Sequence, residues 1–248
     1  MFSNILKNIS PVVKNILLIN IVFYIAQWTF PAITQNLELY PISSQQFRPW
    51  QLATHFFMHS TFSIGHIFFN MFALVIFGSQ LEKVWGPQRF LSYYIICALG
   101  ASILHLSVNY LRIHNIEAGL SSEDLELFSN SGYEAFQKGM NFKDPILAQL
   151  NLLHHTPMIG ASGAIFGLLA AFGYLFPNTE LMLLFPPIPI KAKYFVIGYA
   201  VLELYLGVSN NPSDNVAHFA HLGGALIGII IVLYWGKNRN NFFLMALF

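Results

Sequence analysis

The sequence predicts an all-α membrane protein that forms a single domain over residues 1–248, and three observations carry this expectation. The chain of 248 residues is 55% hydrophobic, only 9% of it is charged, and its mean hydropathy is +0.55. Soluble domains carry about 25% charged residues, so lipid must cover much of this surface. Six apolar runs follow one another, and several approach the ~20 residues that cross a hydrocarbon core. They cover about residues 16–30, 67–81, 90–111, 161–176, 194–208 and 216–235.

The first run, residues 16–30, resembles a secretory signal peptide because Lys7 and Lys14 precede it. No small-x-small cleavage site lies before Pro31, so we expect a retained first spanning helix. The segment that follows, to about Ser63, is too apolar for a free loop and too broken for a span. We expect this first loop to lie in the membrane interface, where Trp and Tyr are favoured.

Turn signals divide the next runs. Gly86 and Pro87 end the second run and begin the third. Prolines also keep residues 177–190 from forming a regular helix, because proline lacks the donor that a helix interior needs. These prolines are Pro177, Pro186, Pro187 and Pro189.

Residues 112–156 interrupt the apolar pattern with an acidic insert between the third and fourth runs. Its acidic residues are Glu117, Glu123, Asp124, Glu126, Glu134 and Asp144. The insert is long enough for one or two helices of its own, and the sequence leaves its fold open. The lone cysteine, Cys97, lies inside the third run, so disulfides are excluded and a packed thiol is expected.

Lysines and arginines set the expected orientation, since they collect on the cytoplasmic side of a membrane. With a cytoplasmic N-terminus, eight fall inside and four outside. The inner set is Lys7, Lys14, Lys83, Arg89, Lys191, Lys193, Lys237 and Arg239, and the outer set is Arg48, Arg112, Lys138 and Lys143. We therefore expect a multi-pass cell-membrane protein with both termini in the cytoplasm. No organelle-targeting segment is visible, which favours a bacterial plasma membrane. The second, fourth and sixth runs then all start on the outer side.

Polar side chains gather at those three starts. His66 and Asn70 share one helical face, Ser162 opens the fourth run, and His218 and His221 open the sixth. A lone serine in an apolar run more often hydrogen-bonds its own helix. Here a neighbouring imidazole can take its proton, and amide, imidazole and helix-start N–H groups can stabilise an oxyanion. The set therefore predicts acyl-transfer chemistry.

Two glycine patterns predict that the fourth and sixth runs touch. Each places glycines four residues apart, which lets helix backbones approach closely. The pairs are Gly163 with Gly167, and Gly224 with Gly228. In such a contact His221, one turn before the second pair, lies level with Ser162, whereas His218 lies a further turn toward the surface. We therefore expect His221 to be the base.

These motifs resemble the rhomboid family of intramembrane serine proteases. The sequence Gly160-Ala161-Ser162-Gly163 with Gly167 matches the family's G-x-S-G pattern. The sequence Ala220-His221-Leu222-Gly223-Gly224 with Gly228 matches its A-H-x-x-G-x-x-x-G pattern. The helix-two histidines and asparagine of the family are matched by His55, His59, His66 and Asn70. The likeness covers about residues 14–236.

The resemblance implies a bundle of six transmembrane helices and a Ser–His dyad without a third carboxylate. It implies that Ser162 is the nucleophile and His221 the general base of an endopeptidase that cleaves transmembrane segments of membrane proteins near their outer ends. It implies oxyanion donors at His66 and Asn70, aided by the Ser162 amide. The implied supporting residues are Gly160, Gly163, Phe166, which packs on the base, Gly224 and His59. No metal or cofactor is implied, and the partners are substrate proteins and membrane lipid.

The sequence departs from the family pattern in places. Seven positions separate His59 from His66 where the family usually has five, and Gln51 stands where arginine is common. His218 has no implied role. Glu203 is an acid within an apolar run. We expect it to be protonated and bonded to a neighbouring helix, with orientation of His221 as the alternative.

Two other functions remain open. The pairs His55 with His59, His154 with His155 and His218 with His221 faintly resemble the histidine boxes of di-iron membrane oxygenases. A non-catalytic rhomboid-like module that binds membrane proteins is the other alternative, although such relatives are expected to lack the serine or the base. A net charge of +1 gives no electrostatic case for nucleic acid. The sequence does not indicate an oligomeric state.

Overall fold

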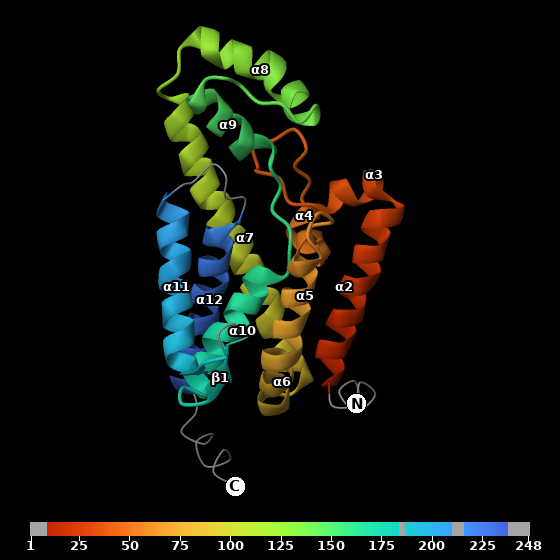
Figure 1. Cartoon of the computed structure of the whole chain (residues 1–248), viewed down its shortest axis with the longest axis vertical. Helices are drawn as coiled ribbons and strands as arrows, with labels where there is room; N and C mark the ends of the chain where they lie inside the picture. Colours follow the sequence, from red (N-terminus) through yellow and green to blue (C-terminus); the bar gives the residue numbers. More distant parts are fainter. Residues whose placement is uncertain (1–8, 184–186, 210–215, 238–248) are drawn as a thin grey trace.

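The computed structural model is a bundle of long helices with a smaller helical layer at one end (Figure 1). It describes residues 9–183, 187–209 and 216–237. The helices are α2 (Pro11–Thr29), α3 (Pro31–Thr34), α4 (Gln51–Thr54), α5 (Ile64–Ala73), α6 (Ser79–Trp85), α7 (Pro87–Glu117), α8 (Ser122–Gln137), α9 (Pro145–His155), α10 (Ser162–Leu175), α11 (Ala192–Ser209) and α12 (His218–Lys237). The shorter elements are the 3₁₀ turns η1 (Gln35–Leu37) and η2 (His55–Phe57), the π-helical turn η3 (Leu74–Gly78), and the strands β1 (Glu180–Met182) and β2 (Pro189–Lys191).

Five described helical segments are long and apolar enough to cross a membrane, which agrees with the expected all-α, multi-pass fold. They are Pro11–Thr29, Ile64–Trp85, Pro87–Glu117, Ala192–Ser209 and His218–Gly236. The second of them joins α5, η3 and α6 into one helix. The remaining apolar helix, α10, is shorter, at 14 residues. It lies at the centre of the bundle, where every residue from Gly163 to Gly173 is buried.

Helices α10 and α12 meet through the glycines that the sequence marked. A Cβ added at Gly224 would collide with the carbonyl oxygen of Gly163, and one added at Gly228 would lie 3.0 Å from the Cα of Gly167. The phenol of Tyr93 on α7 donates a 2.6 Å hydrogen bond to the Gly167 carbonyl. The predicted contact between the fourth and sixth runs is therefore confirmed, and α7 closes over it.

A buried carboxylate fastens α2 to the bundle. Glu82, which is 3% exposed, accepts 3.0 Å hydrogen bonds from the backbone N–H groups of Val12 and Val13, at the start of α2. Those N–H groups have no partner within their own helix, and a helix N-terminus attracts negative charge. The first apolar run is thus a packed element of the bundle.

The first loop is broken into short helical turns, as its sequence indicated, and the buried side chain of Gln51 organises it. The Gln51 Oε1 accepts hydrogen bonds from the N–H groups of Tyr40 (3.3 Å) and Arg48 (3.0 Å). Its Nε2 donates to the carbonyl oxygens of Gln46 (3.0 Å) and Asn36 (3.4 Å). The uncommon glutamine is therefore well suited to hold this loop, because a neutral amide satisfies both donors and acceptors of the backbone.

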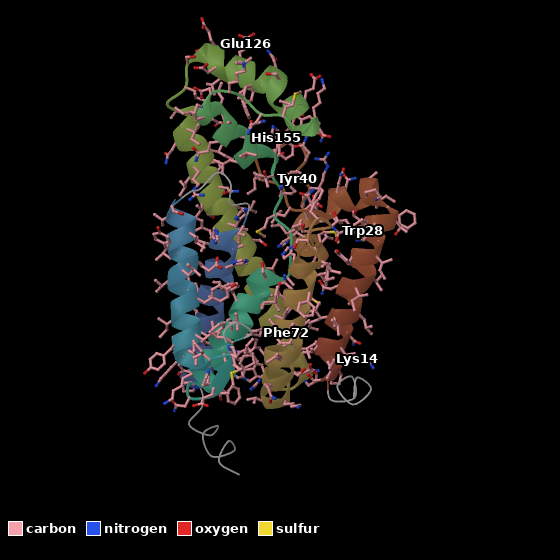
Figure 2. All side chains as sticks on the ribbon, viewed as in Figure 1. Lys14, Trp28, Tyr40, Phe72, Glu126 and His155 are labelled. Atoms are coloured by element: carbon pink, nitrogen blue, oxygen red, sulfur yellow. The ribbon has the colours of Figure 1, made fainter. Side chains whose placement is uncertain are left out.

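The acidic insert extends the bundle at the end where α5 and α12 begin (Figure 1). Helix α7 runs on to Glu117 instead of ending near Leu111, and α8 and α9 pack on each other beyond it. The His155 ring lies against Phe128, Tyr133 and Phe136, and Figure 2 shows it in this layer, above Tyr40 of the first loop. The segment leading from the insert to α10 pairs with the first loop through Leu39 and Met158, with N–O distances of 3.0 and 2.8 Å.

The proline-rich connection is not helical where it is described. Strands β1 and β2 form an antiparallel pair, with Glu180 opposite Lys191 and Met182 opposite Pro189. A helix was correctly excluded for the described residues 177–183 and 187–190, but the strand pairing was not predicted. Pro186, and also Lys7 and Arg239 of the orientation count, lie outside the described residues.

The α10–α12 contact predicts a position-specific cost for added methyl groups. In Gly224→Ala the new Cβ meets the Gly163 carbonyl, so the helices must separate, and we expect a loss of roughly 1–3 kcal/mol or more. The measurement is the midpoint of thermal denaturation in detergent.

Gly198→Ala on α11 is the matched control. An added Cβ at Gly198 meets nothing within 4 Å, so this variant should melt at the parent temperature or slightly above it. Equal melting of the two variants would contradict the close contact.

Candidate active site

Ser162 and His221 are in hydrogen-bond contact between two helices of the bundle. Ser162 is the first residue of α10, and His221 lies in the first turn of α12. The Ser162 Oγ lies 2.8 Å from the His221 Nε2. The imidazole is buried and the hydroxyl half-buried. This is the geometry in which an imidazole can remove a hydroxyl proton.

An aromatic ring fixes the plane of the imidazole. The Phe166 ring stacks on His221 with centroids 4.2 Å apart and planes 5° apart. Tyr199 of α11 lies on the same phenylalanine at 4.8 Å. Phe166 therefore lies where the resemblance implied, and the stacked ring presents its two nitrogens edge-on, one toward α10 and the other toward α11.

His66 faces the backbone just before Ser162. Its Nδ1 accepts a 3.1 Å hydrogen bond from the N–H of Ser60, which leaves the ring proton on Nε2. A Cβ at Gly160 would lie 2.8 Å from that Nε2, and Gly160 has a φ of +113°, which side chains rarely adopt. Both the short distance to His66 and the positive φ therefore favour glycine at position 160. His66 presents its Nε2–H donor beside Ser162.

Asn70 makes a different contact from the one its implied role requires. Its Nδ2 donates a 2.8 Å hydrogen bond to the His66 carbonyl, one turn earlier in α5. The side chain is buried on the same helical face as His66. This contact orients Asn70 toward its own helix, and its oxyanion role stays a prediction.

The first-loop histidines have supporting contacts. The Gln27 amide brackets the backbone of His59, with 2.8 and 2.9 Å hydrogen bonds, and the His59 ring lies 5.1 Å from the His66 ring. The His55 Nδ1 donates to the Gln51 carbonyl at 2.8 Å, and the His55 carbonyl accepts a 3.0 Å bond from the N–H of Gly160. Burial lowers the pKa of His55 to about 4 and that of His59 to about 3, so both rings are neutral. The expected structural role of His59 therefore fits its contacts.

A carboxylate touches the base, which the implied dyad did not include. The Oε2 of Glu203, on α11, lies 2.8 Å from the His221 Nδ1 and 2.7 Å from the His218 Nδ1. Glu203 is bonded to a neighbouring helix, as expected, and its partners include His221, as the alternative expectation requires. The expected protonation of Glu203 stays a prediction. The signals in the sequence were an acid within an apolar run and two histidines three residues apart.

The same three side chains could hold a metal ion. The ligand atoms of Glu203, His218 and His221 lie within 4.8 Å of one another, and no larger set of metal-binding side chains is gathered among residues 9–183, 187–209 and 216–237. His154 instead contacts Glu117 within the insert, at 3.1 Å. Two imidazoles and one carboxylate fall short of the many nitrogen ligands of a histidine-rich di-iron centre.

Fold and site together define a multi-pass, mainly helical membrane protein with a serine and a histidine in contact inside its bundle. The Rhomboid domain model matches residues 46–123 and 126–238, and the chain belongs to the rhomboid family.

Curated relatives agree with this assignment. The chain is 32% identical over 207 residues to RHOMBOID-like protein 12, mitochondrial, of Arabidopsis thaliana, covering 82% of this chain and 51% of the relative. It is 25% identical over 218 residues to Rhomboid protein 1, mitochondrial, of Saccharomyces cerevisiae, covering 85% and 49%. It is 26% identical over 189 residues to Rhomboid protease AarA of Providencia stuartii, covering 73% and 54%. The chain thus spans about half the length of these relatives.

The neutral loop histidines predict that acid destabilises the fold. In the unfolded chain a histidine binds a proton near pH 6.5, whereas His55 resists protonation until about pH 4. The unfolded state therefore holds more protons between those values, so stability falls as pH drops through this window, by on the order of 3 kcal/mol per such ring. The measurement is the melting temperature at pH 7.5 and 5.0.

The His55→Asn variant separates this ring from other titrating groups. Its amide keeps a donor for the Gln51 carbonyl but binds no proton. We expect a smaller acid-induced drop in melting temperature than in the parent. An identical drop in both proteins would show that His55 is protonated in the folded state.

Proposed function

We propose that this chain is an intramembrane serine endopeptidase that cleaves transmembrane segments of membrane proteins near the outer membrane face. The observation that carries the proposal is the 2.8 Å contact between the Ser162 Oγ and the His221 Nε2 within an apolar bundle. Rhomboid membership supports a protease, and one relative bears the name Rhomboid protease AarA. The serine type, the residues and the substrates are our inference.

In the proposed reaction Ser162 is the nucleophile and His221 the general base. The Oγ attacks the scissile carbonyl carbon as its proton passes to the His221 Nε2, and the carbonyl π electrons move onto oxygen. His221 then returns the proton to the leaving amine nitrogen as the C–N bond breaks. A water molecule, deprotonated by the same ring, hydrolyses the resulting ester. The scheme uses no cofactor.

The oxyanion is proposed to receive hydrogen bonds from three sources. The His66 Nε2–H is supported by the tautomer that Ser60 imposes, and the backbone amide of Ser162 lies at a helix start, where N–H groups are free. The second N–H of the Asn70 amide is the third source, since its first is used by the His66 carbonyl. The neighbouring alanines and glycines form a small cavity beside Ser162.

Proposed partners are transmembrane protein substrates, with lipid around the bundle. Large apolar side chains of α2 and α11 are exposed, including Trp28, Val22, Val201 and Tyr205, as expected for surfaces that face lipid. A substrate segment must unwind before its backbone carbonyl can reach Ser162, so segments rich in helix-breaking residues are the favoured substrates.

We propose that the N-terminal end of the bundle faces the cytoplasm of a bacterial plasma membrane. Lys14, Lys83, Arg89, Lys191 and Lys193 lie in segments at or near that end, whereas the acidic insert lies at the other (Figure 1). The distribution of charge supports only which end faces the cytoplasm, and two of the relatives are named mitochondrial proteins.

The central test is chemical labelling and cleavage. A fluorophosphonate probe should label the parent protein at Ser162, and label neither Ser162→Ala nor His221→Ala. Cleavage of single-span membrane proteins reconstituted with the enzyme should fall at least about 10³-fold in both variants, since each removes a member of the reacting pair. Parent-like cleavage by Ser162→Ala would contradict the proposal.

Orientation can be tested by cysteine labelling, because Cys97, the one native cysteine, is buried and should not react with a maleimide. Single cysteines at Lys14→Cys and Glu126→Cys lie in exposed positions at opposite ends (Figure 2). In intact bacterial cells an impermeant maleimide should label the second and spare the first until the membrane is opened. The reverse pattern would place the insert in the cytoplasm.

A further inference from the structure

We infer that Glu203, held by His218, is a positioning residue that sets the orientation and tautomer of His221. The inference rests on the proposed function and adds to the dyad that the family resemblance implies. One carboxylate oxygen of Glu203 lies 2.8 Å from the His221 Nδ1 and 2.7 Å from the His218 Nδ1. The three side chains come from α11 and from the first turn of α12.

The Glu203 contact determines which nitrogen of the base carries the proton. A neutral imidazole has one N–H and one lone pair. With Nδ1–H donating to the carboxylate, the lone pair lies on Nε2, 2.8 Å from the Ser162 Oγ. The opposite tautomer would place N–H toward the serine and could not accept its proton. An acceptor at Nδ1 therefore selects the reactive form.

The ring is fixed on three sides by this arrangement. Phe166 stacks on its face at 4.2 Å, Ser162 lies at one edge, and Glu203 at the other. Rotation of the imidazole would break both hydrogen bonds at once. The carboxylate thus fixes the orientation of the His221 ring as well as the nitrogen that carries its proton.

Burial makes the carboxylate effective. The side chains of Glu203 and His218 are 5% and 7% exposed, and that of His221 is 10% exposed. An unpaired carboxylate in such a site is costly, and His218 supplies a second donor that compensates for lost water. When His221 accepts the serine proton, the adjacent negative charge stabilises the imidazolium, because a charge pair that is largely buried is weakly screened.

The charged and titratable neighbours belong to several helices. Tyr199 of α11 interacts electrostatically with Glu203, and His66 of α5 and His105 of α7 interact with His221. Among these described neighbours Glu203 is the single acid, so its removal leaves the protonated base with no nearby negative charge. A Gln at this position keeps the shape and removes the charge.

The experiment compares the full-length Glu203→Gln, Glu203→Asp and Tyr205→Phe proteins in detergent. Tyr205 lies on the same helix with 69% exposure and serves as the control. The readout is the rate constant for fluorophosphonate labelling of Ser162 across pH 5–9, with kcat and KM for a cleaved substrate where there is one. The rate constant is taken from the labelled fraction only, so unfolded protein does not enter it.

A positioning role predicts labelling at least about 100-fold slower in Glu203→Gln, with KM changed less than about threefold. Its pH profile should also differ in shape from that of the parent, because the charge beside the imidazole has been removed. Labelling of Glu203→Asp should be at least about tenfold faster than that of Glu203→Gln, and Tyr205→Phe should be labelled at the parent rate.

The inference is overturned if Glu203→Gln is labelled at the parent rate and with the parent pH profile, even if less of the variant is folded. That result would mean that Glu203 only stabilises the fold. If the parent protein is labelled but cuts no membrane protein, the proposed endopeptidase activity is refuted. The positioning role of Glu203 is then decided by the labelling rates alone. A parent that is never labelled refutes both.

Discussion

The site depends on the backbone contact between α10 and α12. Gly163 lies against Gly224, and Gly167 against Gly228, so that no side chain separates the two helices. Such a contact fixes both the distance between the axes and their register, because a shift of one residue would bring a Cβ against a carbonyl. Ser162 directly precedes Gly163 in α10, and His221 lies three residues, about one turn, before Gly224 in α12. Their 2.8 Å separation is therefore a consequence of helix packing more than of mutual attraction.

Beside the start of α10, the first loop is held by polar contacts, since its helical turns are short. The Gln51 side chain forms hydrogen bonds with backbone groups of the first loop. The carbonyl oxygen of His55 links that loop to Gly160 by accepting a backbone hydrogen bond. Both side chains are neutral, which allows them to be buried without a counter-charge. The positive φ of Gly160 then turns the chain into α10 while leaving room for His66. The first loop is thus connected to the start of α10, where Ser162 lies, through a few short-range contacts.

The apolar helices and the contact between Ser162 and His221 could be predicted because their signals are local and periodic. Apolar runs identify spanning helices by length alone, and glycines four residues apart mark a face on which two helices meet. The contact of Glu203 had no such signal, since α11 carries no close-packing pattern that assigns its partner. The end of α7 was placed too early and the fold of the insert was left open for a related reason: outside lipid, polar helices are stabilised by caps such as Ser121 and Asp144 and by tertiary packing.

Helix α11 shows how a buried acid can be tolerated in a lipid-facing element. Its only buried described residues are Ala192, Glu203 and Gly207, so one narrow seam joins it to the bundle. Four residues from the carboxylate, the Gly207 carbonyl accepts a 2.6 Å hydrogen bond from Arg112 of α7. The seam therefore brings one acid and one base together within a helical turn, and the side chains exposed on the other faces of α11 are uncharged and mostly apolar. An acid placed there for packing alone would be replaceable by leucine at a gain in stability. Its convergence with two imidazoles, one of them on the serine, gives the charge a chemical reason to remain.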